Sequence, residues 1–165
     1  MSAKHAELTL ALLALASLCV GAAVYLFDRS GGALFVPGAL AAMLPARSLF
    51  GGFSGSLPTF AHVFAFALLT AAVLGLRPKR AMPVCLAWAM VEALFEFGQL
   101  DAAQRALGAV VADWRVSGWL LDRTLEYFAR GTFDIADLFS IALGAAAAYV
   151  LIILLSLGES EHARE

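Results

Sequence analysis

Four long stretches of this chain carry almost no charge, and they limit what it can fold into. The first, residues 8–27, contains no charged side chain at all. The other three are residues 60–76, 82–100 and 133–157. A helix of roughly 20 apolar residues crosses the hydrocarbon core of a bilayer, and all four stretches are near that length. Because lipid offers the backbone no hydrogen bonds, we predict four transmembrane helices.

The composition supports a membrane protein over a soluble one. Hydrophobic residues make up 62% of the 165 residues and charged residues 15%, whereas soluble domains are typically about 45–50% apolar and about 25% charged. A net charge of −2 leaves no basic surface for nucleic acid, so no nucleic-acid partner is expected. We predict a single all-α domain over residues 1–165, an integral membrane four-helix bundle surrounded by membrane lipids.

The first apolar stretch has a competing interpretation as a signal peptide. In that interpretation Lys4 provides the basic start and residues 20–22 provide a small-residue cleavage site. The apolar run, however, continues past that point to Phe27. The continuation favours a retained transmembrane helix.

The two long connections differ in character. Residues 28–57 contain six glycines and two prolines, so a regular element through all of them is not expected. We expect the second helix to begin at Phe60, with Thr59 as its N-cap. Residues 113–130 mix aromatic, leucine and charged residues at helical spacing. This pattern predicts an amphipathic interfacial helix between the third and fourth spans.

The basic residues indicate an orientation. Arg77, Lys79 and Arg80 lie in the short link between the second and third spans, and short loops weigh most in the positive-inside rule. We therefore predict that both chain termini are cytoplasmic and that the two long connections lie at the outer face of the membrane.

Polar side chains within the spans are predicted to gather at that outer end, because neighbouring helices alternate in direction. They are His62 in the second span, Glu92, Glu96 and Gln99 in the third, and Asp134, Asp137 and Ser140 in the fourth. Ionisable groups inside a membrane are costly and are functional candidates by default. Carboxylates gathered in low dielectric cannot all ionise, so a cation must compensate. Arg130, Arg105 and protonated His62 are the candidates.

The third span contains two acids that we expect to differ in role. Glu96 and Gln99 match the predicted depth of His62 and Asp137. Glu92 lies one helical turn deeper, since it precedes Glu96 by four residues. We therefore expect Glu92 to be protonated or purely structural.

Three interpretations of the polar cluster remain open. In a binding or catalytic pocket, His62, Glu96 and Asp137 would act as acids or bases, and Arg130 would hold a phosphate or carboxylate. Alternatively, the cluster is a structural network that ties the helices together. A metal site of His62, Glu96 and Asp137 is the weakest interpretation, because HExxH-type spacing is absent from the sequence. No metal or other cofactor is predicted.

The polar stretches resemble those of the VanZ-like family of small bacterial membrane proteins. The matching pieces, in order, are residues 62–66 (HVFAF), residues 96–99 (EFGQ) and residues 130–138 (RGTFDIADL), which lead to Gly144. The chain departs from the family pattern where residues 58–59 replace Asp-Lys and where Ser140 replaces Asn. The resemblance implies a bacterial cytoplasmic membrane protein with a cell-envelope role. The family is associated with resistance to the glycopeptide antibiotic teicoplanin.

These observations lead to two functional predictions. The first is recognition or modification of the head group of an envelope lipid or a lipid-linked cell-wall precursor, with enzymatic activity left open. The alternative is a non-catalytic membrane subunit whose polar cluster is structural or docks a partner protein. A homo-oligomer and a membrane-protein partner both stay open. A proton-coupled transporter would need a dimer to enclose a pathway.

Overall fold

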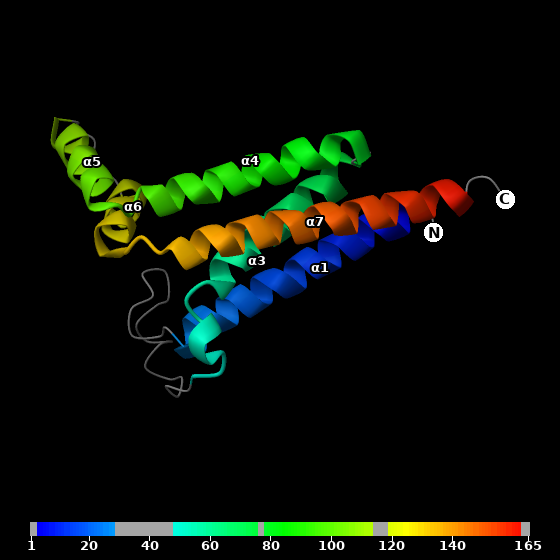
Figure 1. Ribbon diagram of the computed structural model, residues 1–165, viewed down its shortest axis with the longest axis horizontal. Helices are drawn as coiled ribbons and strands as arrows, with labels where there is room; N and C mark the ends of the chain where they lie inside the picture. The colour runs from blue at the N-terminus through cyan, green and yellow to red at the C-terminus, as the bar shows by residue number, and fades with distance from the viewer. Residues whose placement is uncertain (1–2, 29–47, 76–77, 114–118, 163–165) are drawn as a thin grey trace.

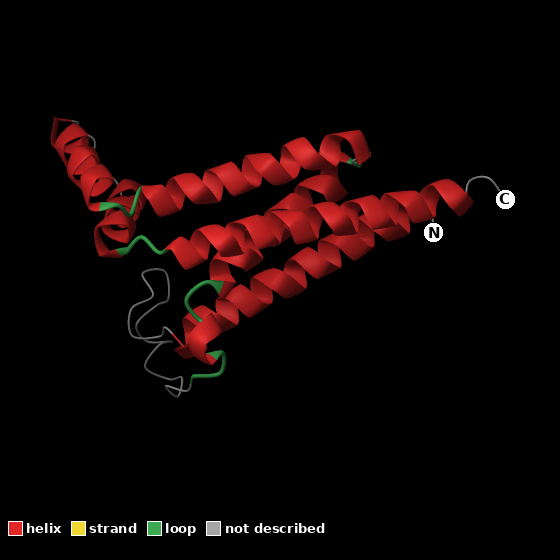
Figure 2. Ribbon diagram, in the orientation of Figure 1, coloured by secondary structure: helices red, strands yellow, loops and turns green. Residues whose placement is uncertain are grey.

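The computed structural model describes residues 3–28, 48–75, 78–113 and 119–162. Every regular secondary-structure element within those residues is a helix (Figure 2). The four longest α-helices are α1 (Ala3–Ala23), α3 (Leu57–Leu74), α4 (Pro78–Phe97) and α7 (Ile135–His162). Two shorter ones, α5 (Asp101–Asp113) and α6 (Trp119–Arg130), lie between α4 and α7 in the chain. The all-α prediction is therefore confirmed for the described residues.

Several of these helices are long and apolar enough to cross a membrane. Three qualify on their own: Lys4–Asp28, Leu57–Leu74 and Ile135–Gly158. The helix α4 qualifies together with the start of α5, as a pair bent by 84°. The described part of the chain thus contains three candidate spans, or four if the bent pair is counted as one, which is compatible with a multi-pass membrane protein.

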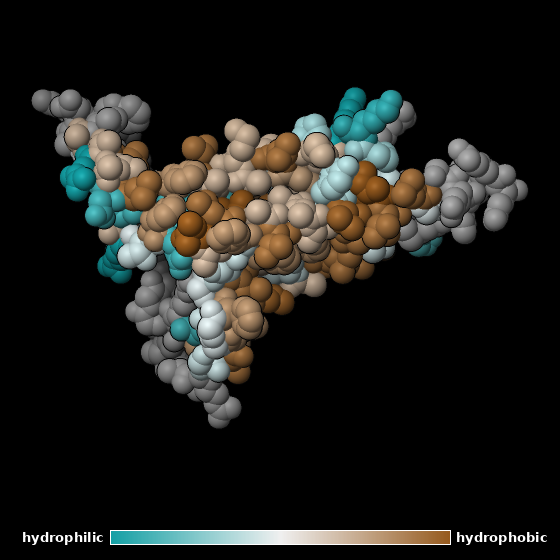
Figure 3. All heavy atoms as spheres, viewed as in Figure 1, coloured by the Kyte–Doolittle hydropathy of each residue, from teal (hydrophilic) through white to brown (hydrophobic). Residues whose placement is uncertain are grey.

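The four long helices lie side by side, and α3 and α7 form the centre of the arrangement (Figure 1). The helix α3 packs on α1, α4 and α7, and α7 packs on α4 and α1 as well. Both chain termini lie at one end, whereas α5 and α6 lie at the other (Figure 1). The face seen in Figure 3 is largely apolar along the long helices and becomes more polar near α5, α6 and the link between α3 and α4.

Small side chains let α3 approach both α1 and α7 closely. On the α1 side, an added Cβ at Gly21 would be 3.5 Å from the Cβ of Ala61, which is almost fully buried. On α7, Gly144 lies against the start of α3, where an added Cβ would be 2.8 Å from the carbonyl oxygen of Phe60. Close backbone approach at small residues is a common way for helices to associate in membranes.

The start of α3 differs from the prediction. The helix begins at Leu57 with Ser56 in the N-cap position, so Thr59 lies inside the helix and the Thr59 N-cap prediction is wrong. The physical reason is Pro58, which lies in the first turn. In the first turn a backbone N–H has no acceptor within the helix, so proline, which lacks the N–H, costs no hydrogen bond there. Its ring also fixes φ at a helical value.

The connection before α3 is tied back to the end of the first span. The Asp28 carboxylate accepts hydrogen bonds from the backbone N–H groups of Leu49 and Phe50 at 2.9 and 3.1 Å. It also accepts one from the Ser48 hydroxyl at 3.1 Å. The described part of this connection forms one short 3₁₀ turn, Gly51–Phe53. The rest of the predicted irregular segment, residues 29–47, lies outside the described residues.

The end of α4 also differs from the prediction. We expected a helix to residue 100, but α4 ends at Phe97 and α5 leaves at an angle of 84°. Gly98 allows this corner, because a Cβ there would lie 2.5 Å from a ring carbon of Phe128 in α6. The predicted interfacial segment is α6 in its described part, Trp119–Arg130, and residues 114–118 lie outside the described residues.

Candidate functional site

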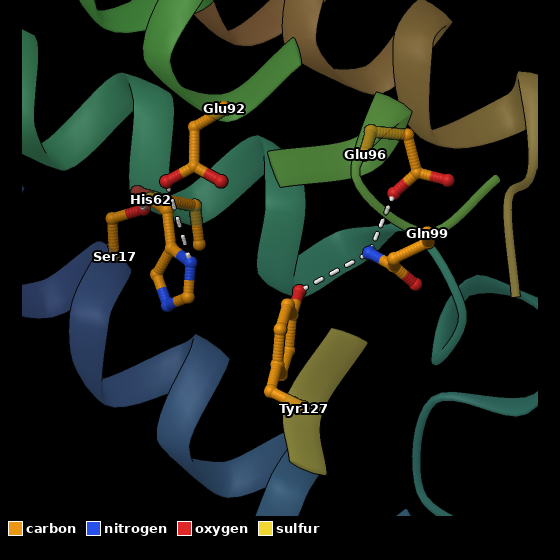
Figure 4. Close-up of polar contacts among 7 residues, drawn as sticks. Ser17, His62, Glu92, Glu96, Gln99 and Tyr127 are labelled. Atoms are coloured by element: carbon orange, nitrogen blue, oxygen red, sulfur yellow. Dashed lines mark hydrogen bonds and ion pairs between the residues drawn. The ribbon is translucent and has the colours of Figure 1, made fainter. Parts of the chain in front are cut away.

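Two groups of contacts include five of the polar side chains predicted from the sequence: His62, Glu92, Glu96, Gln99 and Asp134. Figure 4 shows the first four of these side chains. One group joins α4, α5, α6 and the start of α7, and we call it the amide network. Its members are Glu96, Gln99, Gln104, Tyr127 and Asp134. The other group joins α3 and α4 through His62 and Glu92, and we call it the His62–Glu92 pair.

The carboxylate of Glu96 joins the end of α4 to the start of α7. One oxygen, Oε1, accepts a hydrogen bond from the backbone N–H of Asp134 at 2.6 Å. The other, Oε2, accepts one from the Gln99 side-chain amide at 3.2 Å. With only 4% of its surface exposed, Glu96 has both oxygens engaged by protein donors. A buried acceptor satisfied in this way stabilises the helix arrangement.

The side chain of Gln99 extends this arrangement to α6. Its Nε2 also donates to the hydroxyl oxygen of Tyr127 at 3.3 Å. Gly131 lies so close to the Gln99 side chain that a Cβ there would overlap it. Burial, reinforced by nearby Tyr25 and by carboxylates that include those of Glu92 and Glu96, raises the pKa of Tyr127 to about 12. The phenol therefore keeps its proton at physiological pH.

Gln104 connects α5 to the amide network. Its Nε2 donates to three backbone carbonyls, those of Gln99 at 3.0 Å, Phe128 at 2.8 Å and Gly131 at 3.2 Å. The Gln99 and Gly131 carbonyls follow the ends of α4 and α6, and the Phe128 carbonyl lies in the last turn of α6. Helix ends leave such oxygens without intrahelical partners. One side chain thus fixes how α5 and α6 meet the corner after α4.

The two acids of the fourth span have different surroundings. Asp134 is exposed and caps α7, because its Oδ1 accepts a hydrogen bond from the N–H of Ala136 at 2.9 Å. Asp137 is half-buried, with its Oδ1 atom buried and its backbone N–H bonded to the carbonyl of Asp134 at 3.0 Å. Ser140 lies half-buried about one turn further along α7.

His62 lies opposite Glu92, not at the depth of Glu96 as the sequence predicted. The His62 Nδ1 is 3.8 Å from the Glu92 Oε1, and the two side chains are 35% and 17% exposed. The helix ends give the reason. His62 follows the first residue of α3, Leu57, by five positions, and Glu92 precedes the last residue of α4, Phe97, by five. In antiparallel neighbours those two positions face each other, whereas Glu96 lies beside the corner.

The structure does not bring Arg130 to the acids. The Arg130 Nη2 is 2.6 Å from the Oε1 of Glu126, one turn earlier on the same helix, and its side chain is 63% exposed. Pairs at this spacing form readily on a helix surface. Arg105, another of the three candidate cations, is exposed beside an open groove. The ion pair that the structure gives Arg130 is with Glu126, so compensation of the clustered acids by a cation stays a prediction.

That groove lies where α5 and the link between α6 and α7 meet the corner after α4. It has a volume of about 520 Å³ and is lined by Gln99, Leu100, Asp101, Ala102, Arg105, Gly131, Thr132 and Phe133. No pattern in the sequence indicates the groove itself, because its walls come from segments that are distant in the chain. Tyr127 and Gln104 were missed as members of the amide network for the same reason.

The metal interpretation is not supported by this geometry. Among the described residues, no group of three or more His, Cys, Asp or Glu side chains is arranged to hold a metal ion. Two of the three predicted ligands have separate partners, because His62 pairs with Glu92 whereas Glu96 bonds to Gln99 and Asp134.

Comparisons with known proteins identify no relative. The chain matches no protein-family model, no curated protein and no solved structure.

Proposed function

We propose that this chain is a four-span membrane protein that recognises the head group of an anionic envelope lipid or lipid-linked cell-wall precursor at its polar end. The observation that carries the proposal is the groove of about 520 Å³ beside Arg105. Ligand sites usually have volumes of about 300–1,000 Å³ and combine apolar walls with a few polar groups. The groove meets both criteria, with Leu100 and Phe133 as apolar walls and Gln99 and Arg105 as polar groups.

The chemistry of the groove fits a ligand that is part lipid and part anion. Phe133 stacks on Phe97 at 5.9 Å between ring centroids, and Phe97 belongs to the exposed apolar surface of α4. One wall of the groove therefore continues into a surface suited to acyl chains. Arg105 supplies a planar set of donors that matches phosphate or carboxylate oxygens.

The amide network gives this groove a fixed floor. Gln99 lines the groove and is held by Glu96 and Tyr127. If α4 crosses the bilayer, the 84° corner directs α5 along the membrane surface, where head groups lie. We interpret the network as positioning Gln99 and Arg105 and assign it no reaction.

The resemblance to the VanZ-like family supports the cellular part of the proposal. Two of the resembling stretches, residues 96–99 and 130–138, meet through the hydrogen bond between Glu96 and Asp134. In the proposed topology both termini are cytoplasmic, and the groove faces the outside of a bacterial cytoplasmic membrane. An effect on glycopeptide resistance would follow from binding a cell-wall precursor there.

The test compares two exposed arginines in full-length protein reconstituted in lipid nanodiscs. Arg105→Gln is expected to weaken binding of phosphatidylglycerol, relative to phosphatidylcholine, about tenfold, the effect of losing one charge-assisted hydrogen bond. Arg130→Gln is the matched control, because Arg130 pairs with Glu126 and does not line the groove. Equal affinities for all three proteins would exclude the groove as the head-group site.

The second candidate is a non-catalytic subunit whose polar cluster only fixes helix packing or docks a partner protein. It is favoured by the mutual satisfaction of Glu96, Gln99 and Gln104, which resembles a structural network. Loss of glycopeptide or envelope-stress phenotype in Arg105→Gln at unchanged abundance and melting temperature would favour head-group recognition. A phenotype that follows abundance in every variant would favour the subunit.

A further inference from the structure

The His62–Glu92 pair has no part in the groove, and its surroundings orient the imidazole from two sides. The carboxylate of Glu92 lies 3.8 Å from Nδ1. On the same helix, the Phe66 ring lies at 5.9 Å from the imidazole, measured between centroids. Phe66 is itself stacked on Trp88 of α4 at 4.9 Å, and the Trp88 Nε1 donates to the Thr70 hydroxyl at 2.9 Å. The wall behind the imidazole is therefore fixed to both helices.

This orientation leaves the second ring nitrogen as the reactive one. With Nδ1 toward Glu92, Nε2 points away from the carboxylate (Figure 4). The His62 side chain is 35% exposed, so a ligand atom can reach the ring. A carboxylate near one ring nitrogen favours the proton there and makes the other nitrogen the proton acceptor. The distance of 3.8 Å is longer than a hydrogen bond, and such contacts commonly shorten when a ligand binds.

We propose that His62 and Glu92 form a dyad that binds the hydroxyl group of a membrane lipid. In the bound state the lipid O–H donates a hydrogen bond to Nε2, and no covalent bond forms or breaks. Glu92 keeps the ring proton on Nδ1, so that Nε2 is the nitrogen that accepts. The dyad lies between α3 and α4, and both are candidate membrane spans, α4 together with the start of α5, so a lipid is the ligand class considered. The dyad does not depend on head-group binding in the groove.

The first experiment determines which nitrogen of His62 carries the proton. The chain has three histidines, so His5→Asn combined with His162→Asn leaves His62 as the only signal in nitrogen NMR of the full-length protein in nanodiscs. We expect the neutral ring to carry its proton on Nδ1, and Glu92→Met to transfer it to Nε2. Glu96→Gln is the matched control and should change nothing, because Glu96 bonds to Gln99 and Asp134. A proton on Nε2 in the parent protein would overturn the dyad.

The second experiment asks whether a lipid hydroxyl reaches Nε2. Diethyl pyrocarbonate acylates neutral imidazole nitrogens, and the rate at His62 is compared in nanodiscs that contain diacylglycerol or its acetylated form. Both lipids are uncharged and differ in the hydroxyl group. We expect several-fold slower acylation with diacylglycerol, and the same protection in Arg105→Gln. Equal acylation rates in the two lipids would overturn the dyad proposal, even if phosphatidylglycerol binds in the groove. Protection by diacylglycerol without phosphatidylglycerol binding would overturn only the head-group site in the groove.

Discussion

The amide network and the His62–Glu92 pair lie at the same end of the helices but differ in how their polar groups are satisfied. In the network, Glu96 and Gln99 are 4% and 9% exposed, and their side-chain hydrogen bonds measure 2.6 to 3.3 Å. In the pair, the side chains are 35% and 17% exposed and the closest polar atoms are 3.8 Å apart. Short, buried and mutually satisfied contacts are typical of structural groups, whereas a held but accessible imidazole is available for chemistry. The comparison predicts different responses to substitution.

The largest effect is expected from Glu96→Ala. The substitution removes the acceptor for the part-buried Asp134 N–H and one of the two acceptors of the buried Gln99 amide. Two such losses should lower the free energy of unfolding by about 3 kcal/mol. The measurement is denaturant unfolding in mixed micelles, with His62→Ala as the comparison at less than about 1 kcal/mol. If His62→Ala proved the more damaging of the two, the distinction between network and pair would fail.

The corner after α4 gives the next largest effect. Gly98→Ala places a Cβ 2.5 Å from the Phe128 ring, so α6 must shift away from the corner. The expected destabilisation is about 2 kcal/mol, typical of overpacking. Gly108→Ala is the matched control on α5, where an added Cβ meets nothing within 4 Å. Because alanine has the higher helix propensity, Gly108→Ala should stabilise slightly. Equal melting temperatures for the two variants would contradict the close packing at the corner.

A smaller effect is expected from Tyr127→Phe, and it depends on pH. Removal of the hydroxyl that accepts the Gln99 hydrogen bond should cost about 1 kcal/mol at neutral pH. The folded pKa of Tyr127, about 12, exceeds the usual value of 10.0. Its contribution is therefore complete below the unfolded pKa and is lost as the pH rises toward the folded pKa.

The pH profile supplies the control for that prediction. Melting temperatures of the parent protein should fall between about pH 10 and pH 12 more steeply than those of Tyr127→Phe. Parallel profiles for the parent and Tyr127→Phe would show that burial of this phenol does not contribute to alkaline unfolding.

The smallest stability effect is expected at the pair itself. Glu92→Gln keeps the shape of the side chain and replaces the carboxyl group by an amide, so the free energy of unfolding should change by less than about 0.5 kcal/mol. Glu96→Gln, the corresponding change in the network, should cost more, because the Asp134 N–H then loses its charge-assisted acceptor. Differential scanning fluorimetry of both variants in the same detergent makes the comparison. A reversed order would place the structural role at Glu92.

The sequence predicted where the long helices lie, but it did not predict which polar side chains contact one another. Apolar length alone located the four long helices, whereas α5 was not predicted. Alternation of direction was sufficient to bring His62, Glu96 and Asp137 to one end. The partners depend on where each helix starts and stops, since one residue rotates a side chain by about 100°. Pro58 moved the start of α3, and Gly98 ended α4 before the predicted boundary. Those shifts placed Glu92, not Glu96, opposite His62.

By itself, the sequence determined that this is an all-helical chain with several stretches able to cross a membrane and with polar groups concentrated near one end. Hydrophobic length and helix direction are local properties, so they can be read from the chain. Only the tertiary structure decided that Gln104 and Tyr127 complete a closed network, that Arg130 turns to Glu126 on the surface, and that a groove opens beside Arg105. Those outcomes depend on the corner at Gly98 and on the packing of α6 against it, which join residues far apart in the sequence.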